Sequence, residues 1–277
     1  MSQDPSNASI AGTFTRVAEL LEGQGASPKR VRAWREGAEA VRAEARPVAE
    51  LLRVEGRAGV EAVVGRGLAG AVVEVARTHR CRVLERLQGE VSPRAIFADL
   101  PGVGAALAGR IHRELGVETL EDLERAAHDG RLAALAGFGD RRVAAVRDLL
   151  ATRLTNRRFA PAPPVALLLE LDRRYRELDA AGELRRIAPR RFNPGHKAWL
   201  PVWHEERDGW DFTLLYSNTA LAHDLAKTHD WVIVYYDRDG EGGRATVVTQ
   251  RGVRVVRGRE AESWMVHEGM GAVHAAG

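Results

Sequence analysis

The stretch that decides the fold of the central region reads DLPGVGAALAGRI, residues 99–111. Gly102 and Gly104 bracket the apolar Val103, and the apolar residues that follow recur at helical spacing. A tight Gly-x-Gly turn between two helices is typical of a helix-hairpin-helix, because glycine adopts backbone angles that a Cβ would resist. Without side chains, the backbone N–H groups of the turn can approach an anion beside the positive end of the second helix. The stretch therefore predicts a turn that holds a nucleic-acid phosphate and reads no bases.

The same pattern recurs along the chain. A second copy, LAGFGDRRV at residues 135–143, lies 35 residues further on, and a weaker copy, AVVGRGLA at residues 62–69, has Val63 in place of the first glycine. Repeats at near-constant spacing indicate stacked copies of one unit, whereas a single Gly-x-Gly is more often a plain turn between helices. The residues predicted to bind DNA are Gly102, Val103, Gly104, Ala105, Arg110, Gly137, Phe138, Gly139, Arg141, Arg142, Gly65, Arg66, Arg30 and Arg35.

Composition limits the class of protein. The chain has 277 residues, 45% of them apolar, which is enough for about two folded domains. The formal net charge is only +3, so nucleic-acid binding must come from local clusters. Cys81 is the only cysteine, which excludes an internal disulfide and a cysteine-based zinc site. We find no signal peptide, lipidation motif or membrane-spanning run, and we expect a cytoplasmic protein with no cofactor and no membrane partner.

The pattern of apolar residues changes at the run APAPP, residues 160–164, which cannot continue a helix. Before it the spacing is helical throughout. After it come one helix over 165–178, a basic connection over 185–191, and then segments with a period near two. We expect a disordered segment 1–8, an all-α domain 9–155 with tandem helix-hairpin-helix motifs, a linker 156–164, an α+β domain 165–262 and a disordered tail 263–277.

The second domain is predicted to have the order ββαβββ with an antiparallel sheet. Its strands are expected over 199–204, 210–216, 231–236, 245–249 and 253–256, with a helix that starts at Ser217. We recognise no characterised family in this half of the chain.

From about residue 7 to residue 154 the chain resembles the lyase and hairpin region of family X DNA polymerases, especially the bacterial type. The resemblance rests on the segment 7–10, the helix 30–41, the hairpin 100–111, the run LGVETLEDLERAA at 115–127 and the turn 137–139. It implies that this region binds gapped or nicked DNA. It also implies that Arg30, Trp34 and Arg35 lie near the DNA 5′ end, although a solvated helix face is an equally good interpretation of these three residues.

The resemblance has two gaps. The lysine with which that family forms a Schiff base falls on Ala71, and no lysine occurs between Lys29 and Lys197. A Schiff base needs a free amine, which arginine cannot supply because it stays protonated. The polymerase palm is also missing, since the sequence contains no Gly-Ser pair and too few residues follow the linker. We therefore predict that lyase and polymerase activities are absent.

The most suggestive feature of the second half is DRDGEG, residues 237–242. Asp237, Asp239 and Glu241 alternate after an apolar strand and could hold Mg²⁺ or Mn²⁺. We favour a polar β-turn instead, because Asp-Gly and Gly-Gly are turn dipeptides. Asp237 and Asp239 remain weak catalytic candidates.

Histidines, tryptophans and arginines of the second half give weaker signals. His196, His204, His223 and His229 have no metal-ligand spacing. The tryptophans are more typical of a core than of base stacking, although one or two could stack on a single strand. A set of arginines could extend a phosphate track: Arg185, Arg186, Arg190, Arg191, Arg257 and Arg259.

Three functions stay open from the sequence. The favoured one is a non-sequence-specific DNA-binding protein of repair or processing, which holds the backbone of gapped, nicked or single-stranded DNA. The alternatives are a metal-dependent DNA-processing enzyme with its site in the second domain, and a protein–protein adaptor. A protein partner for the second domain is compatible with each of them.

Overall fold

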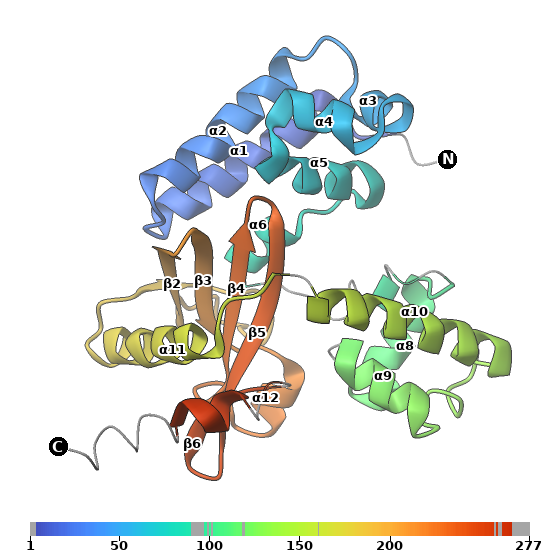
Figure 1. Ribbon diagram of the computed structural model, residues 1–277, viewed down its shortest axis with the longest axis vertical. Helices are drawn as coiled ribbons and strands as arrows, with labels where there is room; N and C mark the ends of the chain where they lie inside the picture. The colour runs from blue at the N-terminus through green and yellow to red at the C-terminus, as the bar shows by residue number, and fades with distance from the viewer. Residues whose placement is uncertain are drawn as a thin grey trace. The chain divides into compact units, whose positions relative to one another are not determined.

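The computed structural model describes residues 4–89, 97–98, 100, 102–117, 120–159, 161–257, 259 and 262–267 (Figure 1). Contacts divide the chain into two units. Unit 1 contains Met1–Glu90, Ala162–Asn218 and Lys227–Gly277, and unit 2 contains Val91–Pro161 and Thr219–Ala226. Each unit has a hydrophobic core of its own, built in unit 1 from buried residues between Ile10 and Leu87 and in unit 2 from those between Phe97 and Leu150.

These units differ from the domain boundaries expected from the sequence. The expected helical domain 9–155 contains both cores, and its first part, up to residue 90, belongs with the sheet. Helical spacing identifies the apolar face of each helix but not the element that covers it. The division therefore depends on tertiary contacts.

The first segment of unit 1 is helical, and its helix starts follow the capping signals of the sequence. Ser6 Oγ accepts a hydrogen bond from the Ser9 N–H, and Ser27 Oγ accepts one from the Arg30 N–H, with Pro28 as the first residue of its helix. The helices are α1 Asn7–Gly23, α2 Pro28–Ala43, α3 Val48–Val54, α4 Gly56–Val64, α5 Arg66–Thr78 and α6 Arg82–Leu87.

Both chain ends are more ordered than the sequence predicts. In place of a disordered segment 1–8, α1 begins at Asn7, whose side chain donates to the carbonyl oxygens of Glu44 and Arg46 at 3.0 and 2.9 Å. In place of a disordered tail from residue 263, residues 262–267 are helical. Ser263 is buried there, and its Oγ accepts a hydrogen bond from the Val256 N–H at 2.9 Å. Residues 1–3 and 268–277 lie outside the described part of the chain.

The second half of unit 1 is built on a sheet whose strands follow one another in chain order, all antiparallel (Figure 1). This confirms the predicted α+β class. The sheet also includes β1, which the sequence analysis treated as a basic connection, because a three-residue edge strand is too short to show a period. The strands are β1 Arg185–Ile187, β2 Leu200–Arg207, β3 Trp210–Tyr216, β4 Val232–Arg238, β5 Glu241–Gln250 and β6 Val253–Val256, with helix α11 Val165–Ala180. Helix α12, Ala220–Asp224, lies in the segment that belongs to unit 2.

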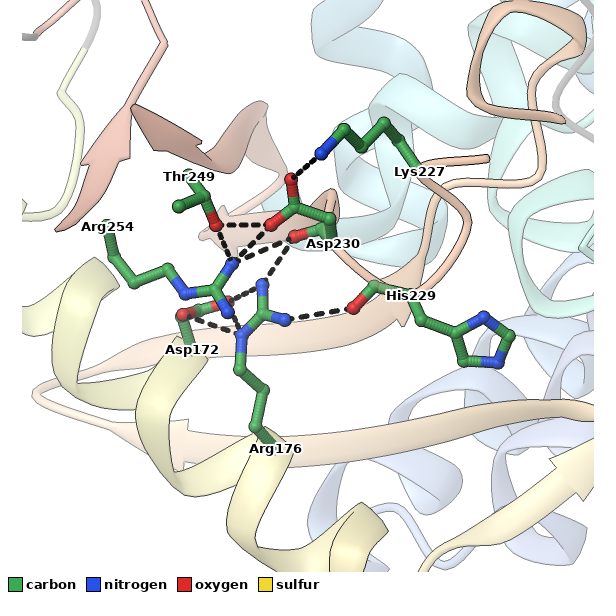
Figure 2. Close-up of polar contacts among 7 residues, drawn as sticks. All are labelled: Asp172, Arg176, Lys227, His229, Asp230, Thr249 and Arg254. Atoms are coloured by element: carbon green, nitrogen blue, oxygen red, sulfur yellow. Dashed lines mark hydrogen bonds and ion pairs between the residues drawn. The ribbon is translucent and has the colours of Figure 1, made fainter. Parts of the chain in front are cut away.

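An ionic clasp, defined by Asp172, Arg176, Lys227, Asp230 and Arg254, connects α11 to the start of β4 and to β6 (Figure 2). Asp172 is 1% exposed, and both of its carboxylate oxygens accept from Arg176 Nε at 3.0 Å. Arg176 also donates to the Asp230 carbonyl at 2.6 Å. Asp172 and Arg176 both lie on α11, so their ion pair satisfies the buried carboxylate, and the hydrogen bonds from Arg176 to the Asp230 and His229 carbonyls fix α11 relative to the start of β4.

A second polar connection joins the first helices to the sheet. His204 on β2 lies between Thr213 Oγ1 and Gln24 Oε1, at 3.0 Å from each, and Gln24 Nε2 donates to the Leu87 carbonyl at 2.7 Å. Because the Gln24 oxygen only accepts, His204 Nε2 carries the proton, and Nδ1 accepts from the Thr213 hydroxyl. Arg30 Nη1 donates to Thr213 Oγ1 at 3.3 Å and completes this hydrogen-bond chain.

Among the described residues, no helix has the length and apolar character that crossing a lipid bilayer requires.

Candidate nucleic-acid interface

The first predicted hairpin turn leads directly into α8, Ala105–Leu115, in unit 2. Val103 is 1% exposed and its N–H donates to the Leu100 carbonyl at 2.9 Å, so it anchors the turn in the core. Gly102 and Gly104 on either side of it are exposed. Asp99 and Pro101, also part of the predicted stretch, lie outside the described residues.

The start of α8 presents free backbone donors. Gly104 is its N-cap residue, no side chain of the described residues caps the helix, and its first turn contains no acidic residue. The first N–H groups of a helix have no partner within the helix. Ala105 and Ala106 are exposed, so their N–H groups are open to an external anion, which the helix dipole favours.

The second hairpin turn repeats this arrangement. Phe138 is 4% exposed and its N–H donates to the Leu135 carbonyl at 3.0 Å, while Gly137 and Gly139 on either side are exposed. The turn leads into α10, Asp140–Phe159. Here the first residue of the helix is the acidic Asp140, whose carboxylate competes with an external anion for the positive helix end.

The two glycines of each turn have different roles. Gly102 and Gly137 have φ values of 78° and 94°, a region that residues with a Cβ rarely adopt. The backbone conformation alone therefore explains why these two positions are glycine. Gly104 has a φ of −69°, and Gly139 also lies outside the positive-φ region. A Cβ at either of these two positions would meet no atom within 4 Å. Nothing inside the described chain requires glycine there, whereas the close approach of an external group would.

The two turns are held against each other within unit 2. Arg110 on α8 donates from Nη1 to the Ala136 carbonyl at 2.6 Å, and a Cβ at Gly137 would lie 2.8 Å from Leu107 Cδ2. Arg142 donates to the Gly137 carbonyl. The arginines thus bind carbonyl oxygens of the second turn and not its N–H groups.

The rest of unit 2 supports this pair of turns. Helix α9, Leu120–His128, packs with α10, and Arg147 donates from Nε to the Ala127 carbonyl at 2.8 Å. Arg141 is exposed at the start of α10 and, within the described chain, makes no ion pair. Thr119, in the run 115–127 on which the resemblance rests, lies outside the described residues.

The weaker third hairpin lies in unit 1, in contact with the turn between β4 and β5. Gly65 joins α4 to α5 with a φ of 75°. A Cβ at Gly240, in the turn between β4 and β5, would lie 2.7 Å from the Gly67 carbonyl oxygen and 2.9 Å from that of Arg66. The Arg66 guanidinium is 3.8 Å from Glu241. The β4–β5 turn thus contacts the carbonyl oxygens of this hairpin, while Gly65, Arg66 and Gly67 remain exposed.

Arg30 and Arg35, expected near a DNA end, are engaged inside unit 1. Arg30 donates to the Phe212 carbonyl at 3.4 Å and to Thr213, and burial lowers its pKa while Asp211 raises it. A polar cavity of about 200 Å³ lies beside it, lined by Gly25, Ser27, Arg30, His204, Glu205, Glu206 and Asp211. Arg35 pairs with Glu22 at 2.6 Å on the surface.

The acidic run at the end of β4 forms a tight turn, as the favoured interpretation predicts. Asp237 Oδ1 accepts from the Gly240 N–H at 3.0 Å, and Asp239 and Gly240 have φ values of 54° and 79°. Within the described part of the chain, no group of three or more histidine, cysteine, aspartate or glutamate residues is arranged to hold a metal ion. The histidines named from the sequence do not gather either, and His204 is part of the hydrogen-bond chain.

Comparison with known proteins agrees with this geometry. Residues 96–150 match the family described as SAM-like helix-hairpin-helix tandem. Unit 2 carries a helix-hairpin-helix tandem. The matched range includes both glycine-bracketed turns, α8, α9 and the start of α10.

The chain is also similar to DNA polymerase/3'-5' exonuclease PolX of Bacillus subtilis (strain 168), with 30% identity over 124 residues. The match covers 44% of this chain and 21% of that protein, so this chain spans about a fifth of its relative's length. The N-terminal region is therefore PolX-like, which confirms the resemblance predicted from the sequence.

Two features of the interface were missed by the sequence analysis. One is the negative charge of Asp140, which disfavours an anion at the start of α10. The rules for helix N-termini could have identified it from the sequence. The other is the contact of Gly240 with the Arg66 and Gly67 carbonyl oxygens of the third turn, for which the sequence carries no signal, because the two positions are far apart in the chain.

Proposed function

We propose that this protein binds DNA without sequence specificity, through the two exposed turns of unit 2, in a DNA-processing role. The observation that carries the proposal is the second glycine of each turn, Gly104 and Gly139. Neither its backbone angles nor the space around it requires glycine, and each directly precedes a helix. The similarity of the chain to a DNA polymerase supports DNA as the ligand.

The binding mode follows from the groups present. Backbone N–H groups of Gly104 to Ala106 would contact phosphate oxygens of one strand, and the turn at Gly139 together with Arg141 would contact a second position. Such contacts position the backbone and carry no base information. Because bound phosphates release counterions, affinity should fall steeply with salt. We propose gapped, nicked or single-stranded DNA as the preferred forms.

The test is the variant Gly104→Val in the full chain. Valine suits the extended backbone at this position and has free space, so the fold should persist while the added side chain blocks phosphate approach. Loss of a hydrogen bond to a charged group predicts an affinity lower by roughly tenfold or more, equally for all sequences. Binding is measured by fluorescence anisotropy over a range of salt concentrations.

The matched control is Ala144→Val, which adds the same side chain at an exposed position of α10. It should leave the affinity within twofold, on the order of the effect of an ordinary surface change. If Gly104→Val binds every DNA form as tightly as Ala144→Val does, the proposed contact at the first turn is refuted.

The lyase reaction of the resembled family is not part of the proposal. Ala71 on α5 packs against the core of the first helices, in the place where that family has its lysine. Lys29 is engaged with Glu206 at 2.8 Å, and this hydrogen bond raises the pKa of the lysine. A raised pKa leaves less of the free amine that a Schiff base needs. Incubation with abasic DNA and borohydride should trap no covalent adduct.

A further inference from the structure

Unit 1 contains a strongly basic loop that the hairpin turns do not explain. It connects β1 to β2 and reads APRRFNPGHKAW, residues 188–199. Together with the strand residues before it, the segment 185–199 carries five cationic side chains and no acidic one. In a chain whose net charge is only +3, this is a local cluster of the kind that binds phosphates.

The loop is fixed from within. Asn193 is buried, its Nδ2 donates to the Lys197 carbonyl at 2.9 Å, and its Oδ1 accepts from the Lys197 N–H at 3.1 Å. Asn218 Nδ2 donates to the Arg191 carbonyl at 3.2 Å. These hydrogen bonds hold the backbone of the loop. Arg190 and Lys197 are exposed.

Phe192 is the second feature of the loop. Its side chain is 47% exposed, although its φ is 53°, a region that bulky residues rarely adopt. Asparagine or glycine would suit this backbone better, so loop stability does not explain an aromatic ring here. The Arg191 guanidinium lies 5.1 Å from the ring centroid. A half-exposed ring with a cation beside it is suited to stacking on a base.

A second group of rings lies at the other end of the loop. Trp199 is partly exposed, and its ring centroid is 6.4 Å from that of His229, which is exposed. Arg176 of the ionic clasp donates to the His229 carbonyl at 3.1 Å. Figure 2 shows the His229 ring directed away from the clasp. The clasp therefore fixes the backbone and leaves this ring at the surface beside Trp199.

We propose that the loop 188–199 binds single-stranded nucleic acid, with bases stacked on Phe192 and Trp199 and phosphates on Arg190 and Lys197. A duplex hides its base faces within its own stack, so exposed rings favour a single strand. The site lies in unit 1 and its residues are separate from the hairpin turns. The proposal therefore does not depend on the proposed function of unit 2.

Tryptophan fluorescence reports on unit 1, because all six tryptophans belong to it and Trp199 lies in the loop itself. In the full chain, titration with oligo(dT) should quench the fluorescence. Phe192→Asn removes the ring and suits the positive φ, and it should weaken oligo(dT) binding about fivefold or more, measured by anisotropy. Phe192→Trp, which keeps an aromatic ring at this position, should bind oligo(dT) with the affinity of the wild type. The control is Val54→Asn, at an apolar position 71% exposed in the same unit, which should have no effect.

Further arms separate this site from the hairpins and from charge alone. In the background of Gly104→Val, the loss caused by Phe192→Asn should be of the same size, which identifies an independent site. Blunt duplex and polyglutamate should displace oligo(dT) poorly. The proposal is overturned if oligo(dT) leaves the fluorescence unchanged, if Phe192→Asn and Val54→Asn bind alike, or if polyglutamate displaces oligo(dT) at equal charge.

Discussion

Acidification should destabilise unit 1 through His204. The ring is buried between α1 and the sheet, near the cations Arg30 and Arg86, and burial with these charges lowers its pKa to about 3 from the ordinary 6.5. The folded protein therefore keeps the ring neutral, whereas the unfolded chain protonates it below about pH 6.5. The contribution of His204 to stability is complete above the pKa of the ring in the unfolded chain. It is lost as the pH falls towards the pKa of the ring in the folded protein.

The magnitude follows from these two pKa values. Between about pH 7 and about pH 5, the unfolded chain gains about 0.7 of a proton at this site and the folded chain gains almost none, which lowers the free energy of unfolding by about 2 kcal/mol. The loss stays near this value for any folded pKa below about 4, because the folded ring is then neutral throughout the window. Glu206, whose pKa is lowered mainly by its hydrogen bond from Lys29, titrates below this window.

Urea unfolding followed by tryptophan fluorescence measures this effect, since the six tryptophans report on unit 1. The variant His204→Leu should be less stable at about pH 7 but should lose most of the wild-type dependence on pH. Burial raises the pKa of Asp211, whose titration acts in the opposite direction, but it is present in both proteins and cancels in the comparison. The exposed His196→Asn serves as the control and should keep the wild-type slope. Parallel curves for the wild type and His204→Leu between about pH 5 and about pH 7 would refute the reasoning.

Three further predictions concern the sheet and the second turn. Gly240→Ala should lower the free energy of unfolding by roughly 1–3 kcal/mol in urea titrations, because a Cβ there meets the Gly67 backbone at a positive φ; unchanged stability would contradict the contact. Arg176→Met leaves the Asp172 carboxylate buried without its ion pair and should cost roughly 3–5 kcal/mol in the same assay, whereas a loss below about 1 kcal/mol would mean that the clasp contributes little. Asp140→Asn removes a negative charge from the start of α10 and should tighten DNA binding about twofold to fivefold in anisotropy titrations, and equal or weaker binding would show that the second turn does not meet phosphate.

Local patterns determined much of this protein in advance. The glycine-bracketed turns and the helices that follow depend on neighbouring residues and on glycine's freedom of φ, so the sequence alone predicted them. Val103 and Phe138, predicted to bind DNA, are instead buried and anchor the turns in the core. The same holds for the antiparallel strands, whose alternation and turn residues are local signals. The tight turn at Asp239 and Gly240 was likewise the favoured interpretation of its dipeptides.

Only the tertiary structure decided which partner each surface has. Arg30 looked like a surface cation on a helix, yet its guanidinium bonds to β3, because contacts between positions far apart in sequence leave no local pattern. The third hairpin has the local form of a phosphate-binding turn, yet its Arg66 and Gly67 carbonyl oxygens meet Gly240 of the β4–β5 turn, a contact that leaves no local pattern either. The local sequence predicts a turn whose N–H groups can bind an anion. The packing of segments distant in sequence determines whether those N–H groups are accessible to one.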